Sequence, residues 1–478
     1  MNSVEELMIH ERLLTDEQLK RARILQQQLG SHLGDALLSL DLLPEEQIMR
    51  FFNPVPPVPV KIADTGLDES FLVDLSLKAA YLEAGTFSVQ SIAETLCLPF
   101  SVVTELIERI RTDHLATVRS MNGYGDTTQI LELTQRGRER AEAARAISQY
   151  VGAAPVPLQD YTRALVRQTV REIDLDRAWI HAGLQHLVIG QQLLDQLGPA
   201  FASGRSIFLY GPPGTGKTSI AEALGRKLPG EVYIPQAITV SGQIIRLFDS
   251  AIHKELQHTS QQETGQLDLN RHIRHDPRWK KCHRPVVMVG GELTPDMLEF
   301  RYDESSRFYE APIHMKAGNG MFILDDFGRQ RIAPRQLLNR WIIPLERGTD
   351  FPSLHTGMKL TIPFDQITVF CTNLNPLDLV DDAFLRRIRH KIHIRHQTEE
   401  EFKEIMRRIC EAQGIACEAQ TVEYLLENYY RKTNRPMAAN HPRDLMEHIV
   451  DRARFLKQPV ALAPEAIDSA AANYFVKL

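Results

Sequence analysis

The sequence of 478 residues has few cysteines, no long apolar run and little excess charge. Its five cysteines lie far apart without a Cys-x-x-Cys pair, which argues against a disulfide scaffold or a zinc site and is typical of reduced thiols. No stretch approaches the ~18 apolar residues that a membrane span requires, and the acidic start lacks the apolar segment of a signal peptide. We therefore expect a cytoplasmic protein with no membrane span.

The net charge of −6 is too small to draw the whole chain toward nucleic acid or an anionic membrane. With 43% hydrophobic and 24% charged residues, the composition is that of an ordinary globular protein. A chain of this length exceeds one hydrophobic core, so we expect about three domains. Two proline-rich breaks, at 53–60 and 151–157, are the candidate linkers between them.

The first domain, expected at 1–52, contains an internal helical repeat. The segment Leu13–Leu19 recurs 29 residues later as Leu42–Ile48, each time with acidic residues where a helix would start. This tandem repeat resembles the N-terminal domain of type II secretion and type IV pilus-assembly ATPases, some of which bind cyclic di-GMP. In that family each repeat opens with Arg-Leu-Gly, whereas here the two copies read Ser-Val-Glu and His-Leu-Gly. The domain is either a docking module or a dinucleotide sensor.

The second domain, expected at 71–145 between linkers at 53–70 and 146–160, has the pattern of a winged helix. Helices are expected at 88–96 and 101–111, followed by two strands on either side of a turn-rich segment. The last strand and the helix after it resemble the end of winged-helix domains.

A winged helix suggests DNA, but the charges argue against it. Residues 1–150 carry 14 Lys and Arg against 22 Asp and Glu, and the expected recognition helix offers Glu105 and Glu108 beside Arg109 and Arg111. Phosphate contacts, which supply most non-specific affinity for DNA, need a clustered basic face. We therefore favour protein docking for this domain and keep DNA binding as the alternative.

The most informative stretch is an apolar strand at 207–210 that runs directly into G-x-x-x-x-G-K-T. Glycines in such a loop let backbone N–H groups turn toward phosphate oxygens. Lys217 supplies a charge for the β- and γ-phosphates, and the Thr218 hydroxyl is placed to bind Mg²⁺. The helix that follows directs its positive dipole end at the same anion. The expected phosphate site consists of Gly211, Pro212, Pro213, Gly214, Thr215, Gly216, Lys217, Thr218 and Ser219.

Two strands further along the chain end in polar residues. Met321–Leu324 is apolar and leads into Asp325, which we expect to hold Mg²⁺ through water, and Asp326, which stands where a base would orient the attacking water. The strand at 367–372 is followed by Asn373, whose amide can hold that water or the γ-phosphate.

Two arginine segments complete the set. Arg386 and Arg387 lie at a basic helix end, where one of them could reach the γ-phosphate of an adjacent subunit, and the alternative is a solvated basic face. Arg443 lies in a helix that begins with Pro442 in its first turn, from which it could touch phosphate.

In this order the parts resemble the AAA+ ATPase superfamily over roughly residues 160–478, where they are termed Walker A, Walker B, sensor 1, arginine finger and sensor 2. Val188, Ile189 and Gly190 are similar to the segment that lines the adenine pocket of that superfamily. The resemblance implies that the chain binds ATP and Mg²⁺ and assembles with itself into a ring, expected to be a hexamer.

The fold class expected from these resemblances is an α/β P-loop NTPase (AAA+) with a C-terminal helical lid. The core would span 161–395 and the lid 396–478, preceded by the small helical repeat domain and the winged-helix-like α+β domain. Most relatives have Glu at the position of Asp326. Because Asp is one methylene shorter, we expect poorer alignment of the water and slow turnover.

Two functions fit this assembly. The chain is either an ATPase that remodels a protein partner, with pilus or secretion components as candidates, or a slow nucleotide-dependent switch, in which case the winged helix could bind DNA. The segment between 241 and 321 is longer than a minimal ATPase needs and contains a basic stretch at 271–284 and aromatics at 307–312. These could line a central channel or be a solvated loop with core aromatics. His272, His275 and His283 lack partners at ligand spacing, so no metal is expected there.

Overall fold

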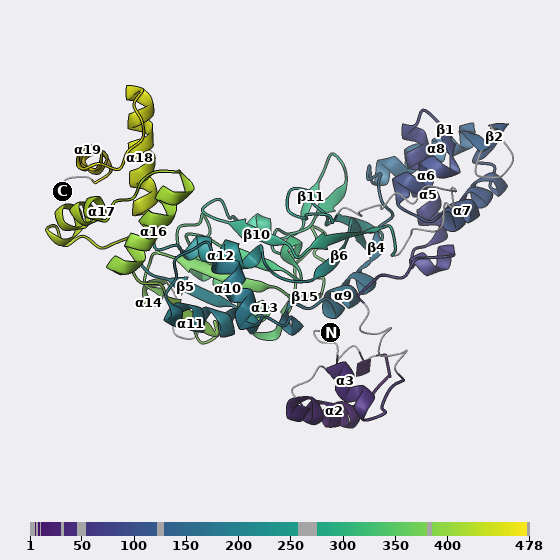
Figure 1. The fold of residues 1–478 in the computed structure, drawn as a ribbon. Helices are drawn as coiled ribbons and strands as arrows, with labels where there is room; N and C mark the ends of the chain where they lie inside the picture. Colours follow the sequence, from purple (N-terminus) through teal and green to yellow (C-terminus); the bar gives the residue numbers. More distant parts are fainter. Residues whose placement is uncertain are drawn as a thin grey trace, which may run out of the picture.

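The computed structural model describes residues 5, 8–9, 11–29, 33–44, 54–121, 129–256, 275–379 and 385–475. Figure 1 shows an α/β core in the middle, the last helices at one end, the elements of 69–147 at the other, and the first helices beside the core. In these ranges no helix is long and apolar enough to cross a membrane.

The core is a parallel sheet of five strands in the order β10-β13-β16-β5-β17. Nearly all residues of the three central strands are buried, since both faces of the sheet are covered. Since all strands run in one direction, the polar residues that follow β5, β13 and β16 meet at one edge of the sheet. The strands are β5 (Ile207–Tyr210), β10 (Val286–Val289), β13 (Met321–Leu324), β16 (Ile367–Thr372) and β17 (His390–His393).

Helices pack on both faces of this sheet. Ile207 and Leu209 of β5 point to one face and Phe208 to the other, as the alternation of a strand requires. The first face is covered by α10 (Arg177–Leu184), α11 (Gln191–Ala202) and α12 (Lys217–Gly225). The second is covered by α13 (Pro334–Arg347), whose Trp341 is fully buried against Phe322 and Phe370. A short helix, α14 (Pro376–Leu379), follows β16.

A second sheet, in the order β11-β12-β8-β7-β4, is built largely from the long segment between α12 and β13. Tyr309 is fully buried in it, and Phe308 is partly buried, with its ring packed edge-on against Tyr150 at a centroid distance of 5.5 Å, so both aromatics of 307–312 pack against the protein interior. The elements are β4 (Val156–Pro157), β6 (Glu231–Pro235), β7 (Ala237–Val240), β8 (Gln243–Arg246), β9 (Trp279–His283), η4 (Pro295–Leu298), β11 (Arg301–Asp303), β12 (Phe308–Glu310), η5 (Met315–Ala317), β14 (Thr349–Asp350) and β15 (Ile362–Pro363), with β6 paired to β9 and β14 to β15.

Residues 62–147 form a three-stranded antiparallel sheet with four helices. The helix expected at 88–96 is present, and it begins after Ser88, whose hydroxyl accepts a hydrogen bond from the Ser91 N–H at 3.1 Å. The second expected helix and both strands are present as well, whereas the expected turn at 122–126 lies outside the described residues. The elements are η1 (Ile62–Thr65), α5 (Glu69–Leu82), β1 (Thr86–Ser88), α6 (Val89–Leu96), α7 (Phe100–Thr112), β2 (Ala116–Met121), β3 (Gln129–Leu133) and α8 (Gln135–Ile147).

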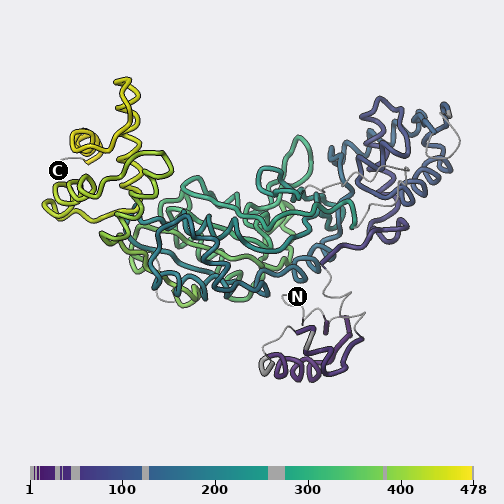
Figure 2. The backbone as a smooth tube through the Cα atoms, viewed as in Figure 1, coloured from purple at the N-terminus to yellow at the C-terminus, as the bar shows by residue number. Residues whose placement is uncertain are grey.

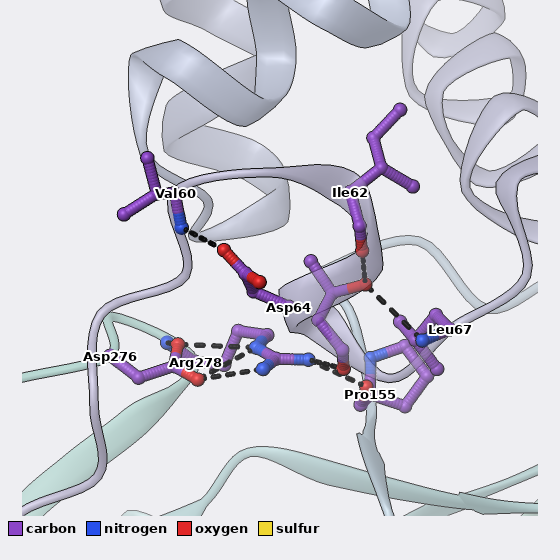
Figure 3. Close-up of polar contacts among 8 residues, drawn as sticks. Val60, Ile62, Asp64, Leu67, Pro155, Asp276 and Arg278 are labelled. Carbon is purple, nitrogen blue, oxygen red and sulfur yellow. Dashed lines mark hydrogen bonds and ion pairs between the residues drawn. The ribbon is translucent and has the colours of Figure 1, made fainter.

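Both segments expected as linkers are packed rather than free where the structure describes them. A buried ion pair, Arg278 with Asp276 at 2.7 Å, lies between them (Figure 3). The Arg278 guanidinium also donates to the carbonyls of Thr65 (2.9 Å) and Pro155 (3.4 Å), and the Ala154 N–H donates to the Leu96 carbonyl at 2.8 Å. A buried guanidinium needs such acceptors, and the two segments supply them.

The N-terminal unit consists of α2 (Asp16–Leu29) and α3 (Leu33–Ser39), which bury a leucine-rich cluster against Val166 of α9 (Leu158–Arg167). The tube in Figure 2 shows this unit beside the core. The first repeat begins a helix as expected, with the Thr15 N–H donating to the Gln18 side chain at 2.9 Å. The second helix start, after Pro44, lies outside the described residues.

The helices after β17 share a separate apolar core that includes Phe402, Met406, Leu425, Tyr430 and Met446. We refer to residues 396–475 as the helical lid. Its elements are α16 (Glu399–Ala412), α17 (Ala419–Leu426), the π-helical turn η6 (Glu427–Arg431), α18 (His441–Leu456) and α19 (Pro464–Tyr474).

Candidate phosphate and nucleotide site

The loop after β5 has a backbone that only glycine can adopt at two positions. Gly211 and Gly214 have φ of 144° and 73°, in the region that disfavours side chains. A Cβ atom on Gly211 would lie 2.1 Å from the Ile394 carbonyl oxygen, and one on Gly214 would lie 2.1 Å from Oδ1 of Asn440. The loop is therefore wedged between β17 and the helical lid.

Lys217 places a buried ammonium group at this loop. Its side chain is 6% exposed, and Nζ donates to the carbonyls of Gly211 (3.0 Å) and Pro212 (2.7 Å). Burial lowers the pKa of the ammonium group, and the nearby Asp325 and Asp326 act in the opposite direction. The site thus holds a desolvated cation at the point where the loop turns into α12.

Thr218 and Asp325, which the sequence predicts as Mg²⁺ ligands, are hydrogen-bonded to each other. The Thr218 hydroxyl donates to Oδ1 of Asp325 at 2.6 Å, so two oxygen ligands lie together beside the loop. Such oxygens fit Mg²⁺, which usually binds one or two protein oxygens and completes its shell with phosphates and water. Among the described residues no cluster of three or more His, Cys, Asp or Glu could hold a metal ion.

Asp326 and Asn373 also meet, because β13 and β16 are neighbours in the sheet. The Asn373 amide donates to Oδ1 of Asp326 at 3.2 Å. Asp326 has a φ of 47°, which is uncommon for a residue other than glycine and aims its carboxylate away from the strand. The hydroxyl of Thr372 fixes the neighbouring backbone by donating to the Phe327 carbonyl at 2.6 Å.

Gln330 is a site residue that the sequence reasoning missed. Its Nε2 donates to the Asp325 carbonyl at 2.8 Å, and its Oε1 accepts from the Gly328 N–H at 2.8 Å. It therefore fixes the turn that carries both aspartates. Nothing in the local sequence distinguishes it from any other polar turn residue.

A cavity of about 830 Å³ lies between the core and the helical lid beside the phosphate loop. Val188, Ile189 and Gly190, which the sequence predicts to contact adenine, are among the residues that line it. From the core it is also lined by Tyr210, Thr215, Gly216 and Ile220, and from the lid by Glu401, Ile405, Arg408, Ile409 and Ala439.

Arg443 is not among the residues that line this cavity and is turned toward acidic neighbours. The helix α18 starts against the phosphate loop, since the Asn440 N–H donates to the Gly214 carbonyl at 3.2 Å. The Arg443 side chain is 68% exposed, with Nε 3.7 Å from Asp444 and 3.5 Å from Glu447. The structure brings its helix to the loop, while the guanidinium contacts its own helix.

Arg386 and Arg387 lie at the opposite end of the sheet from the phosphate loop. Ser206, just before β5, donates to the Arg387 carbonyl at 3.4 Å, whereas the loop follows the other end of that strand. Four strand residues span ~13 Å. Arg387 pairs with Glu346 of α13 at 2.5 Å and Arg386 is exposed. The two arginines line a second cavity, of about 560 Å³, together with Arg205, Arg389 and Lys391.

The basic stretch expected at 271–284 is largely neutralised where it is described. Lys280 pairs with Glu255 at 3.0 Å, Lys281 pairs with Glu231, and Arg278 pairs with Asp276. Residues 271–274, including His272, lie outside the described residues. His275 and His283 belong to no metal-binding cluster among the described residues.

Comparisons with known proteins bear on the core and the lid. Residues 190–342 match the AAA ATPase domain family, and residues 398–473 match a domain family of unknown function. Neither match includes the N-terminal repeat. A search of curated protein sequences found no match.

Among solved structures the chain is similar to NtrX from Brucella abortus, with 11% identity and a TM-score of 0.36 over 72% of this chain and 61% of NtrX. It is also similar to domain III of the Thermotoga maritima replication initiation protein DnaA, with 12% identity and a TM-score of 0.35 over 63% of this chain and 99% of that domain. A third similar structure is that of the T. maritima Holliday junction branch migration motor RuvB, with 15% identity and a TM-score of 0.31 over 59% of this chain and 69% of RuvB. The chain thus spans less than two thirds of NtrX.

The AAA ATPase match begins at Gly190, in the wall of the large cavity, and runs through the phosphate loop and the acidic end of β13. The matched segment therefore coincides with the site that the side chains build. Residues 190–342 thus carry an AAA ATPase domain.

Proposed function

We propose that this protein binds MgATP between its core and helical lid and hydrolyses it to remodel a protein partner. The observation that carries the proposal is the contact of Thr218 with Asp325 at 2.6 Å, beside the buried ammonium of Lys217. The adjoining cavity of about 830 Å³ has a size typical of small-molecule sites, which run to roughly 300–1,000 Å³.

Each side chain has a definite task in this reaction. Lys217 would exchange its bonds to the loop carbonyls for the β- and γ-phosphate oxygens. Thr218 and Asp325 would hold Mg²⁺, which neutralises charge on the phosphates when it is bound. Asp326, held by Asn373, would orient the attacking water and accept its proton. Arg443 would turn from its own helix to the γ-phosphate once the anion is present.

Arg386 and Arg387 point to a ring, expected to be a hexamer. They lie too far from the phosphate loop of their own chain to serve it, and an arginine at this place could complete the site of a neighbouring subunit. Arg387 is half-buried and already held by Glu346, so its guanidinium is partly ordered before a neighbour arrives.

The N-terminal domains would select the partner. In the helix α7 of the winged-helix-like domain, Glu105 accepts from the Ile62 N–H at 3.0 Å and Arg109 pairs with Glu69 at 3.1 Å. These charges are engaged within the domain, which supports protein docking over DNA. The repeat resemblance makes pilus or secretion components the first partners to test and cyclic di-GMP the first small ligand.

Substitution of the phosphate-loop lysine tests the site. Lys217→Ala should abolish MgATP binding, measured by calorimetry on the full chain, because the buried cation is lost. Lys227→Ala, on an exposed residue just after α12, is the matched control and should bind as the wild type does. Equal affinity in Lys217→Ala and wild type would refute the phosphate-site assignment.

A slow nucleotide-dependent switch is the second candidate, and one observation favours it. The carboxylate of Asp326 is short and is already bonded to Asn373 at 3.2 Å, so less of it is free to act on water. A turnover on the order of one per second or faster would favour the motor. A much slower rate with retained nucleotide would favour the switch, and binding to duplex DNA that weakens steeply with salt would revive the DNA interpretation.

A further inference from the structure

The wall of the nucleotide cavity at 185–190 has no regular secondary structure of its own. Within it, a turn bond joins the Leu187 N–H to the Leu184 carbonyl at 2.9 Å. Two carbonyls of the segment are instead bonded by the lid. Nη1 of Arg408, in α16, donates to the carbonyl of Gln185 at 2.9 Å and to that of Leu187 at 3.4 Å. A residue 223 positions away thus fixes the backbone that leads into Val188 and Ile189.

The same helix holds Arg408 in place and also contacts the far end of the segment. Glu404, one turn earlier, accepts from Nε of Arg408 at 2.7 Å. At the other end, Glu401 packs on Gly190 so closely that a Cβ there would lie 2.9 Å from its Oε1. Glu401 is itself fixed by Arg395 through two bonds of 2.7 and 2.9 Å. Segment 185–190 is therefore clamped by α16 at both ends.

We propose that α16 forms part of the base-recognition site and that Arg408 is the positioning residue that holds 185–190 against the nucleoside. This inference rests on the proposed function, since it concerns the same nucleotide. It gives a role to the lid domain, whose family match carries none. Recognition of the base depends on the lid, whereas the triphosphate is held mainly by the core loop.

The proposal separates the two halves of the ligand. Lys217, Thr218 and Asp325 contact neither Arg408 nor segment 185–190 through the bonds described here, so loss of Arg408 leaves the phosphate cradle intact. A ligand with a base stabilises the clamped segment and therefore the closed lid, and the lid in turn raises affinity for the base by the same factor.

The test compares ATP with a ligand that lacks the base. Calorimetry on the full chain would measure the affinities of magnesium tripolyphosphate and MgATP for the wild type and Arg408→Ala. We expect MgATP affinity to fall on the order of tenfold, as for loss of one charge-assisted hydrogen bond, while tripolyphosphate affinity stays within twofold of the wild type. Steady-state KM should rise while kcat at saturation is kept.

Two further variants keep the test specific. Arg407→Ala is the matched control, because Arg407 is the next residue but pairs only within α16, with Glu404 and Glu411 at 2.8 Å each. It should bind both ligands normally. Arg408→Lys should recover part of the lost ATP affinity, since an ammonium can still donate to one carbonyl.

Each other outcome overturns the inference or the function beneath it. Unchanged ATP affinity in Arg408→Ala, or an equal fall for ATP and tripolyphosphate, overturns the role in base recognition. A wild-type chain that binds tripolyphosphate and ATP equally well overturns it too. A wild-type chain that binds neither ligand contradicts the proposed function itself.

Discussion

We expect the carboxylate of Asp326 to set the rate of ATP hydrolysis. It hangs from a backbone with a φ of 47°, directly after the buried strand β13, and its one described side-chain bond is to Asn373. A general base contributes roughly 10²–10⁴ to a rate when its reach and orientation are right. A side chain one methylene short should realise only part of that factor.

Asp326→Glu should therefore increase ATP turnover, roughly tenfold, within the range that a general base can supply. The longer side chain brings the carboxylate nearer the water while Asn373 can still donate to it. Phosphate release at saturating MgATP measures the effect, and Asp326→Asn, which keeps the shape but loses the base, should be inactive. A rate in Asp326→Glu below that of the wild type would show that the shorter side chain is already placed correctly.

The site residues differ in whether a local sequence pattern predicts them. Lys217, Thr218 and Asp325 were predictable because their chemistry depends on a local pattern, a strand followed by a particular loop or carboxylate. Gln330 and Arg408 were not, because they bond to backbone carbonyls, which any sequence offers. Only the fold decides which carbonyl lies within reach.

At the scale of elements, the helices and strands of the core follow from apolar pattern and turn residues, and the sheet order brings their polar ends together. The strand β4 was expected as linker, since Val156-Pro157 is short and proline-rich. It pairs with β7 because the second sheet offers it a free edge. The edge belongs to β7, which lies far from β4 in the sequence, Ile238 being the partner of Val156. A local pattern cannot reveal such a pairing.

The junction in Figure 3 carries a prediction about stability. Asp276→Asn should destabilise the fold by about 3–5 kcal/mol, because it leaves the buried Arg278 guanidinium without its countercharge. Thermal unfolding of the full chain, with hydrogen exchange of residues 54–65, measures the loss and where it falls.

The ion pair of Lys280 with Glu255 provides the control on the same strand, β9. Both side chains are partly exposed, 31% and 49%, so Glu255→Gln should cost about 1 kcal/mol or less. If Asp276→Asn and Glu255→Gln lowered the free energy of unfolding by similar amounts, the ion pair of Arg278 with Asp276 would not be what stabilises the junction.

At the scale of the whole molecule, the nucleotide cavity lies between the core and the helical lid, which the chain connects through the residues between β17 and α16. The core supplies the phosphate loop and the lid supplies α16 and the start of α18, so closing one on the other encloses the ligand. At the far end, the second sheet packs on the domain at 62–147, where Ala237 and Ile244 share its apolar core.

The order and direction of the core strands explain why two arginines predicted for catalysis lie away from the phosphate loop. Arg386 and Arg387 precede β17, whereas the loop follows β5, and these two strands are parallel neighbours. Ser206, just before β5, donates to the Arg387 carbonyl, so these arginines lie at the strand end away from the phosphate loop of their own chain. In the proposed function, these arginines serve the phosphate site of a second subunit.

Mixing two inactive variants tests whether the hydrolysis site is shared between subunits. Arg387→Ala should bind MgATP but not hydrolyse it, and Asp326→Asn should do the same for a different reason, with Arg386→Ala assayed in parallel. In a mixture, an intact phosphate site on one subunit can meet an intact arginine from its neighbour, so we predict that steady-state phosphate release reappears and peaks near equal proportions. No release at any ratio, or full activity of both arginine variants alone, would contradict a site shared between subunits.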